Sequence, residues 1–392
     1  MADGMTDRHR KVGRQVALVL QGGGALGAYQ AGAYAALARG GYQPDWVAGI
    51  SIGSINAAII AGNAPDQRSA RLLEFWELVS SSSALWPDLP MHEWQLALRQ
   101  AGALTALVFG QPGFFRPNAM NAWITGRSPT SYYDTAELRR TLERLVDFDR
   151  INAREMRFSV GAVAVRTGNF RYFDNRHETI LPEHVMASGA LPPGFPGIEI
   201  EGELYWDGGL VSNTPLQYVL QNEPHRDTLA FQVDVFSARG DIPRDLEAVE
   251  ARRKDIVYSS RTRMGVDTFR TAHAMRRNIA SLLARLPADL PDGPDLAFLR
   301  KASTLAHMDV VHLIDRSGEA QCAAKDFEFS RATMQARWRR GEHDGNEALA
   351  ASPWLAPPAP TVAMRTFDIG HEKTRAAQAD TTATPVAAHL PR

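Results

Sequence analysis

The sequence has few of the features that mark secreted or nucleic-acid-binding proteins. Its 392 residues include one cysteine, Cys322, which excludes an intramolecular disulfide and fits a reducing compartment. No motif surrounds Cys322, so it is a poor candidate for a nucleophile. The formal net charge of −1 excludes a global field that would attract nucleic acid or a membrane, and we expect no nucleic-acid partner.

Long apolar runs are also lacking. Residues 1–14 are polar and charged, and the next apolar run, 16–20, is too short for a signal-peptide core or a membrane span. No other stretch approaches about 20 apolar residues. We therefore expect a cytoplasmic protein with no signal peptide or transmembrane segment. Peripheral contact with the inner face of the membrane stays open.

What the sequence does contain predicts an α/β fold. Hydrophobic residues make up 44% of the chain, which is enough for a sizeable core. The apolar runs 16–20 and 46–50 suit buried strands, and the helix-like runs 28–39 and 54–61 follow them. This alternation predicts a mainly parallel sheet. Ligands bind such sheets at the carboxyl ends of the strands.

A G-x-S-x-G motif, Gly49 to Gly53, stands where the second predicted strand meets its helix. This is the sequence form of a nucleophile elbow, in which a sharp turn exposes a serine. The two glycines allow close approach of the strand and the helix. The helix N-terminus and the Ile52 amide favour negative charge next to Ser51. The motif predicts that Ser51 is a catalytic nucleophile.

A glycine run, Gly22, Gly23 and Gly24, follows the first predicted strand and has more than one interpretation. Its backbone N–H groups could hold the oxyanion of a tetrahedral acyl intermediate. The run through Gly27 also satisfies G-x-G-x-x-G, and Asp45 follows at a distance that would suit dinucleotide binding. That interpretation leaves the serine motif unexplained. A tight turn without chemistry is the third interpretation.

The base that would activate the serine is the deciding question. An elbow after only the second strand is early for a hydrolase with the order serine, acid, histidine. Asp207 follows the strand-like run 204–206 and precedes Gly208 and Gly209, so a second backbone can approach closely. A buried carboxylate facing a serine can act as the general base. Alternatively, Asp207 only forms a turn. The histidines nearest the motifs fit no catalytic frame and are expected to be structural: His177, His184 and His225.

Over residues 14–240 the three motifs, in this order, resemble those of the patatin-like phospholipase family. The resemblance implies a three-layer α/β/α fold and a Ser51–Asp207 dyad in place of a triad. It also implies an oxyanion hole at the glycine run, with no metal and no cofactor. The chain departs from the family at Leu26, where a basic residue is often found, which leaves the headgroup in question. The segments around the aspartate also look like the family's: 187–195 and 213–215.

The rest of the chain predicts additions to this catalytic domain. Residues 80–127 are rich in aromatic and aliphatic side chains and form either core or a lid over the serine. Residues 241–370 predict a mainly helical extension, with one strand at 310–314 and a last helix at 327–340. Residues 372–392 predict a disordered tail. Within the extension, 244–285 holds ten basic and five acidic residues, a net charge of +5. Together with the arginines of 331–340, this stretch could bind anionic headgroups, or be a solvated helix face.

Three functions are compatible with the sequence. The leading one is a lipid acyl hydrolase of the phospholipase A type that works through an acyl-enzyme. The second is an esterase or thioesterase, or a hydroxyalkanoate-oligomer hydrolase, acting on soluble acyl esters. The third is a non-catalytic dinucleotide-binding or regulatory protein. The sequence leaves acyl length, headgroup, regiospecificity and oligomeric state open.

Overall fold

A computed structural model describes seven ranges of the chain: 13–80, 110–118, 130–222, 226–287, 293–316, 324–359 and 361–369, without the side chains of 260–265. Several sequence features fall outside these ranges. They are Cys322, His225, most of the aromatic segment 80–127 and the tail 372–392.

A mixed, mainly parallel sheet forms the centre of the molecule. Its strand order is β11-β10-β9-β1-β2-β5-β8-β7, and β6 pairs with β5. The strands from β11 to β5 pair in parallel, whereas β6, β7 and β8 pair antiparallel with their neighbours. The bounds are β1 Gln15–Leu20, β2 Trp46–Gly49, β5 Arg157–Ala164, β6 Phe170–Asp174, β7 Ile198–Ile200, β8 Glu203–Asp207, β9 Thr228–Asp234, β10 Met308–Ile314 and β11 Met364–Asp368.

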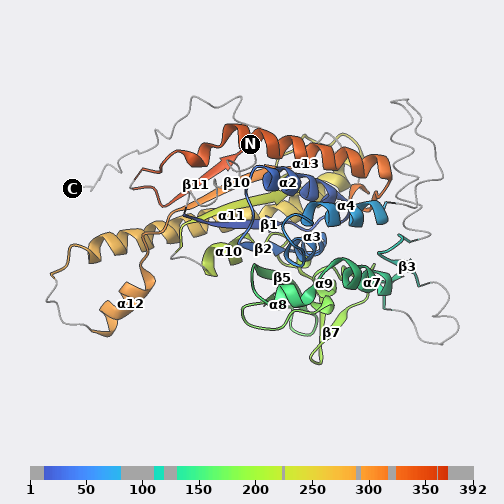
Figure 1. Ribbon diagram of the computed structural model, residues 1–392, viewed down its shortest axis with the longest axis horizontal. Helices are drawn as coiled ribbons and strands as arrows, with labels where there is room; N and C mark the ends of the chain where they lie inside the picture. Colours follow the sequence, from blue (N-terminus) through green and yellow to red (C-terminus); the bar gives the residue numbers. More distant parts are fainter. Residues whose placement is uncertain are drawn as a thin grey trace, which may run out of the picture.

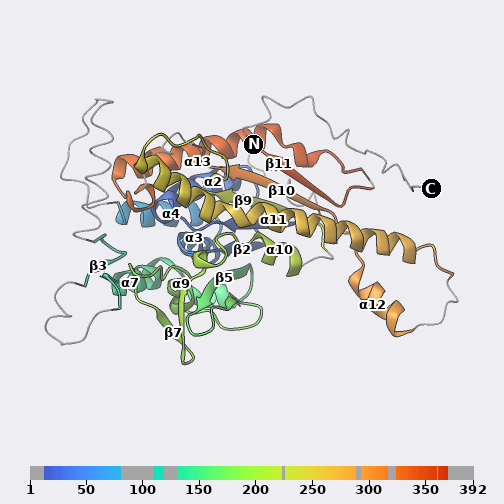
Figure 2. The ribbon, with the colours of Figure 1, turned by 180° about the vertical axis from the view of Figure 1, so that it is seen from behind.

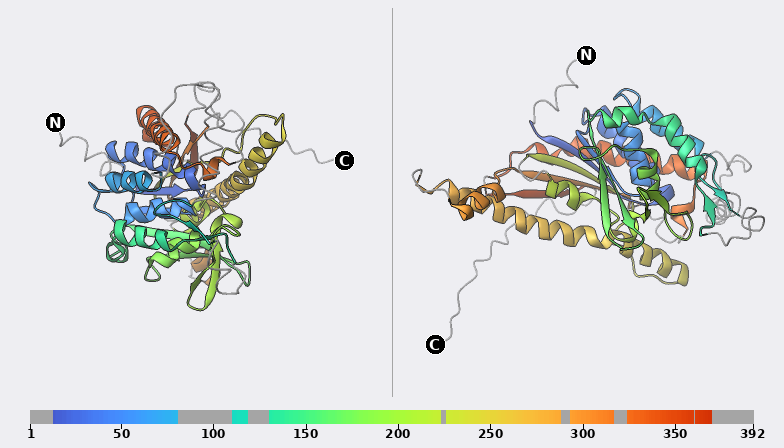
Figure 3. Two further views of the ribbon diagram at one scale, coloured as in Figure 1. Left: turned by 90° about the vertical axis from the view of Figure 1, so that its right-hand side faces the viewer. Right: turned by 90° about the horizontal axis from the view of Figure 1, so that it is seen from below.

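Helices cover both faces of the sheet, which confirms the predicted three-layer α/β architecture. Figures 1 and 2 show α2, α3 and α13 on one face and α10 and α11 on the other. The side view in Figure 3 places α13 opposite α11. Two apolar clusters form the core, one on each face, and the second one includes α10 and α11 side chains. The main helices are α2 Gly27–Arg39, α3 Ile52–Ala61, α4 Arg68–Leu78, α7 Ala136–Leu145, α8 Phe148–Asn152, α9 Pro182–Ser188, α10 Leu216–Asn222, α11 Leu246–Leu283, α12 Pro294–Ala302 and α13 Arg331–Ala351.

The last helix differs from its sequence prediction. The pattern predicted a helix over 327–340, but α13 begins at Arg331 and continues to Ala351. It passes through Gly341, where a Cβ would lie 2.0 Å from the Tyr29 carbonyl oxygen of α2. A Cβ on Gly32 of α2 would likewise lie 2.0 Å from the Trp338 carbonyl oxygen of α13. Glycine here permits close helix packing instead of ending the helix, and the packing offsets its low helix propensity.

The C-terminal region is mainly helical, as predicted, and it also supplies two strands of the central sheet. The sequence predicted β10, whereas β11 and α12 were not predicted. β10 pairs with β9 and β11 pairs with β10, so the region continues the same sheet. The domain boundary near residue 240 stays a prediction, although the sheet runs across it.

Candidate active site

Ser51 lies in the sharp turn between β2 and α3. Its φ of 54° lies in the left-handed region, which is strained for a residue with a side chain. A Cβ on Gly49 would lie 2.2 Å from the Gly53 carbonyl oxygen, and a Cβ on Gly53 would lie 2.4 Å from that of Leu20. Both glycines of the G-x-S-x-G motif are therefore required by close backbone approach. The turn has the geometry of a nucleophile elbow.

Asp207 ends β8 and meets the serine at the carboxyl side of the sheet. It is 2% exposed, and its carboxylate accepts a hydrogen bond from the Gly209 amide at 2.7 Å. Burial raises the pKa of Asp207 to about 7, and the nearby Ser51 side chain and the Gly209 amide oppose the rise. A Cβ on Gly208 would lie 2.5 Å from the Gly161 carbonyl oxygen of β5. This close passage positions the carboxylate.

The glycine run after β1 provides amides next to the serine. The Gly22 amide donates to the Asn213 carbonyl oxygen at 3.1 Å. Among the described residues, the amides of Gly23, Gly24 and Ile52 have no hydrogen-bond partner. Gly22 instead provides space, because a Cβ there would lie 3.1 Å from the Ser51 Cβ. Three free donors thus lie around the serine, and Gly22 is not one of them.

Buried polar side chains hold these backbone segments in place. The Gln21 side-chain oxygen accepts from the amides of Val235 and Phe236, at 2.8 and 2.9 Å. The Asn213 side-chain amide donates to the Gly22 carbonyl oxygen at 3.0 Å. The Ser51 amide donates to the Ser188 hydroxyl at 3.1 Å. The sequence resemblance had marked the segments that contain Asn213 and Ser188 without giving either residue a role.

A cavity with about 660 Å³ of empty space, its opening included, leads to Ser51 and Asp207. One wall is aromatic, with Phe114 and Phe195 at 5.8 Å between ring centroids and Phe114 and Phe329 at 6.0 Å. Of the aromatic segment that was expected to be either core or a lid, the described Phe114 and Phe115 line this cavity and are also buried.

The C-terminal region supplies another part of the cavity wall. Residues Asp326, Phe327 and Phe329 line the cavity, and a Cβ on Gly24 would lie 2.2 Å from the Asp326 carbonyl oxygen. Lys254 of α11 donates to Asp326 at 2.8 Å, and Lys325 donates to Asp255 of α11 at 2.6 Å. These two ion pairs fix the wall to α11. Periodicity alone could not identify this contribution, because the segment is far from the motifs in sequence.

The acid of the dinucleotide interpretation, Asp45, lies away from the glycine run, and the histidines are not part of the cavity lining among the described residues. The Asp45 carboxylate accepts from the Val16 amide at 2.8 Å, at the beginning of β1, whereas the glycine run follows its end. Asp45 therefore cannot serve a nucleotide at the glycine run, and the dinucleotide interpretation loses its acidic partner. His184 is buried and its Nδ1 accepts from the Leu181 amide at 2.9 Å. No histidine is among the described residues that line the cavity.

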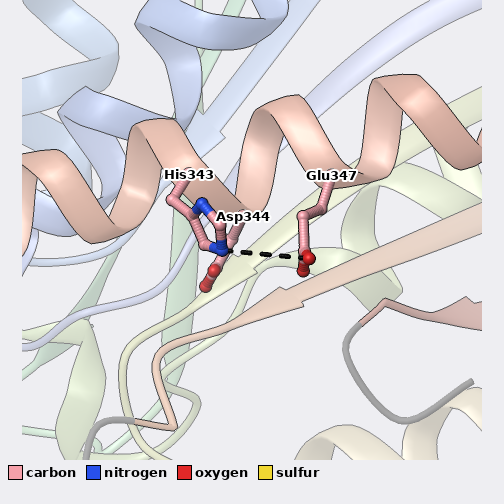
Figure 4. Close-up of side chains that lie close together, drawn as sticks. All are labelled: His343, Asp344 and Glu347. Carbon is pink, nitrogen blue, oxygen red and sulfur yellow. Dashed lines mark ion pairs between the residues drawn. The ribbon is translucent and has the colours of Figure 1, made fainter. Parts of the chain in front are cut away.

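Among the described residues, one group of side chains could hold a metal ion, and it lies outside this cavity. His343, Asp344 and Glu347 project from α13, and Figure 4 shows the ion pair of 3.8 Å between His343 and Glu347. Asp344 already accepts a hydrogen bond from the Tyr29 hydroxyl at 2.6 Å. None of the three lines the cavity.

Much of the basic charge of this region, for which either headgroup binding or a solvated helix face was predicted, binds the protein itself. Arg337 is 1% exposed and donates to the carbonyl oxygens of Lys325 and Glu328. Arg252 donates to two carbonyl oxygens, those of Ser237 and Ala238. Other partners are also within the chain: Arg253 with Glu250, Lys254 with Asp326, Arg277 with Leu305, Arg331 with Glu77 and Arg340 with Asp315. These residues stabilise the C-terminal region and give little support to headgroup binding by this stretch.

A serine in a sharp turn, a buried acid and free backbone amides thus meet at one cavity, and comparison with known families identifies the class of protein. A family model described as "Patatin-like phospholipase" matches residues 18–220, and a second, described as "Patatin phospholipase", matches residues 256–361. The chain belongs to the patatin-like phospholipase family. It is accordingly a hydrolase that acts on lipid esters.

Solved structures that resemble the chain share little sequence with it. VipD from Legionella pneumophila has 15% identity and a TM-score of 0.32, over 83% of this chain and 67% of that one. ExoU from Pseudomonas aeruginosa, in complex with SpcU, has 18% identity and a TM-score of 0.27, over 65% of this chain and 52% of that one. A second ExoU–SpcU structure has 15% identity and a TM-score of 0.28, over 89% and 74%. Because these scores are low, the assignment depends on the family models.

No curated protein matches the chain. Within the described residues, no helix has both the length and the apolar character needed to cross a membrane.

Proposed function

We propose that the protein cleaves lipid acyl esters through a Ser51–Asp207 dyad and an acyl-enzyme. The observation that carries the proposal is that Ser51, in its strained turn, and the buried Asp207 line the same apolar cavity, close enough for the Ser51 side chain to lower the pKa of Asp207. Serine is a weak nucleophile until a base accepts its proton. Asp207 is our candidate for that base, because it is a buried acid that lines the same cavity as Ser51.

In the proposed first half-reaction, the Ser51 oxygen bonds to the ester carbonyl carbon while Asp207 takes the hydroxyl proton. The free amides of Gly23, Gly24 and Ile52 donate to the resulting oxyanion, and one such donor contributes about 3 kcal/mol. The bond from carbon to the alcohol oxygen then breaks, and Asp207 returns the proton to that oxygen. The alcohol leaves and an acyl ester of Ser51 remains.

In the second half-reaction, Asp207 accepts a proton from water as the water oxygen bonds to the acyl carbon. The bond to Ser51 breaks, the serine oxygen regains a proton from Asp207, and the fatty acid leaves. The aromatic wall around Phe114 and Phe329 suits the acyl chain, because apolar surface buried there contributes about 25 cal/mol per Å². The net reaction consumes one ester and one water.

The test compares hydrolysis of p-nitrophenyl acyl esters by the wild type, Ser51→Ala and Asp207→Asn. Each substitution should lower kcat by a factor of about 10⁴ or more, as for essential members of other catalytic sets. Ser303→Ala, at the end of α12, is the matched control and should keep wild-type rates. Thermal unfolding of each variant establishes that it is folded. Retained activity in folded Ser51→Ala would rule out the assignment.

A further inference from the structure

A second cavity adjoins the first, and the proposed chemistry does not use it. It has about 1250 Å³ of empty space and lies between α10, α11 and the segment after Asp207. Gly209, Asn213 and Tyr258 line both cavities, so these residues form the partition between them. Gly209 is also the residue whose amide donates to Asp207. The second cavity thus begins directly beside the dyad.

Tyr258 on α11 is the aromatic member of this partition. Its ring packs against Phe236 with 5.0 Å between centroids, and its carbonyl oxygen accepts from the Asn213 side-chain amide at 3.3 Å. These contacts fix where the ring lies. Among the described residues, its hydroxyl has no hydrogen-bond partner. Burial and then the charges of Asp207 and Asp326 raise the pKa of Tyr258, so the hydroxyl keeps its proton and can donate it to a ligand.

The lining of the second cavity is aromatic and polar at once. Tyr172 and Tyr218 stack with 3.9 Å between ring centroids. Gln217 and Gln221 lie one helical turn apart on α10. Their side-chain amides have no hydrogen-bond partner among the described residues. Amide and hydroxyl groups on an aromatic surface suit a neutral ligand that carries hydroxyls. None of the described residues that line the second cavity has a charged side chain, so none of them would pair with an anionic ligand.

We infer that the second cavity binds the alcohol part of the ester, and that this alcohol is an uncharged polyol such as glycerol. The inference rests on the proposed hydrolase function. The acyl chain lies along the aromatic wall, the ester carbon lies at Ser51, and the alcohol extends past the partition. The Tyr258 hydroxyl donates a hydrogen bond to a hydroxyl of the alcohol. Tyr258 is then a residue that determines specificity and takes no part in bond cleavage.

The experiment compares esters that share an octanoyl chain and differ in the alcohol. The probes are 1-monooctanoylglycerol, p-nitrophenyl octanoate and 1-octanoylglycerol 3-phosphate, each below its micellar concentration. The wild type should cleave the glycerol ester with a higher kcat/KM than the anionic phosphate ester. Tyr258→Phe should raise KM for the glycerol ester about fivefold, the effect of one neutral hydrogen bond, with kcat unchanged. Its constants for p-nitrophenyl octanoate should stay at wild-type values.

Two variants sharpen this comparison. Gln217→Ala, which changes the cavity from α10, should also raise KM for the glycerol ester alone. Tyr132→Phe is the matched control, because Tyr132 is 68% exposed and lines neither cavity. It should leave the constants for all three esters unchanged.

The outcomes separate the inference from the function on which it rests. Equal effects of Tyr258→Phe on the glycerol and p-nitrophenyl esters, or none on either, would overturn the inference and leave the hydrolase intact. A preference of the wild type for the phosphate ester would also overturn it. If the wild type cleaves none of the esters, the proposed function fails and the inference falls with it.

Discussion

At the scale of single residues, Asp207 determines the pH at which the proposed reaction can run. A general base must be deprotonated to accept the serine proton. Because burial raises the pKa of Asp207 to about 7, kcat/KM should rise with pH through an apparent pKa of about 7 and then level off. Initial rates for p-nitrophenyl butyrate between pH 5 and 9, roughly two units on either side of that pKa, measure this. A profile already flat at the acidic end would contradict the role of Asp207.

The raised pKa of Asp207 also predicts how pH changes the stability of the fold. Activity should rise with pH, whereas the contribution of Asp207 to stability should fall. A carboxyl whose folded-state pKa is raised stabilises the fold below its unfolded pKa, and that contribution is lost as pH rises through about 7. Asp207→Asn removes the buried charge, so above pH 7 it should be more stable than the wild type, by on the order of 1 to 4 kcal/mol. Urea unfolding at several pH values tests this, and a variant less stable than the wild type at alkaline pH would contradict it.

The proposed catalytic residues were accessible to sequence reasoning because each lies next to glycines that mark a tight turn. Ser51 and Asp207 stand in such motifs, and both line the same cavity. Two other features were not predicted. The Gly22 amide donates to the carbonyl oxygen of Asn213, which is 191 residues away in sequence. Tyr258 stands in no sequence motif. Such contacts depend on tertiary structure and leave no local pattern.

At the scale of elements, the contact between α2 and α13 joins the C-terminal region to the N-terminal one. A side chain at Gly341 would meet the α2 backbone at 2.0 Å, and two packed backbones cannot both move without losing core contacts. Gly341→Ala should therefore lower the free energy of unfolding by about 3 kcal/mol, a large value for a single methyl group. Chemical denaturation with circular dichroism measures the loss.

A matched substitution separates this effect from the general consequences of replacing glycine. Gly293 precedes α12, and a Cβ there would have no neighbour within 4 Å. Gly293→Ala should change stability by no more than about 0.5 kcal/mol. Equal losses in the two variants would contradict the packing argument.

Elements whose ends are marked by local residues were predicted well, whereas elements that depend on contacts with distant neighbours were not. The sequence predicts a short helix at 182–188, and α9 has these bounds because Pro182 at its first position and Gly189 after its end mark both termini. The predicted end of α13 at residue 340 was wrong because a glycine usually weakens a helix, and only its contact with α2 shows why it is tolerated. β11 is short and half-buried, so it lacks the continuous apolar run of β1.

At the scale of the whole molecule, the C-terminal region belongs to the same folded unit as the motifs. It supplies β10 and β11 at one end of the sheet, α13 on one face and a wall of the active-site cavity. A fragment of residues 1–240 should therefore show no cooperative thermal unfolding, while the full chain does, because the fragment exposes the apolar face of α2 and the edge of β9. Circular dichroism of the two proteins tests this. A cooperative transition in the fragment would support an independent domain.

Active-site labelling tests whether Ser51 is the nucleophile. A fluorophosphonate reacts covalently with an activated serine, and peptide mass spectrometry locates the adduct. We expect one adduct per chain, on Ser51, which is absent in folded Ser51→Ala, strongly reduced in Asp207→Asn and unchanged in Ser303→Ala. An adduct on another residue, or labelling that persists in Ser51→Ala, would contradict this role of Ser51.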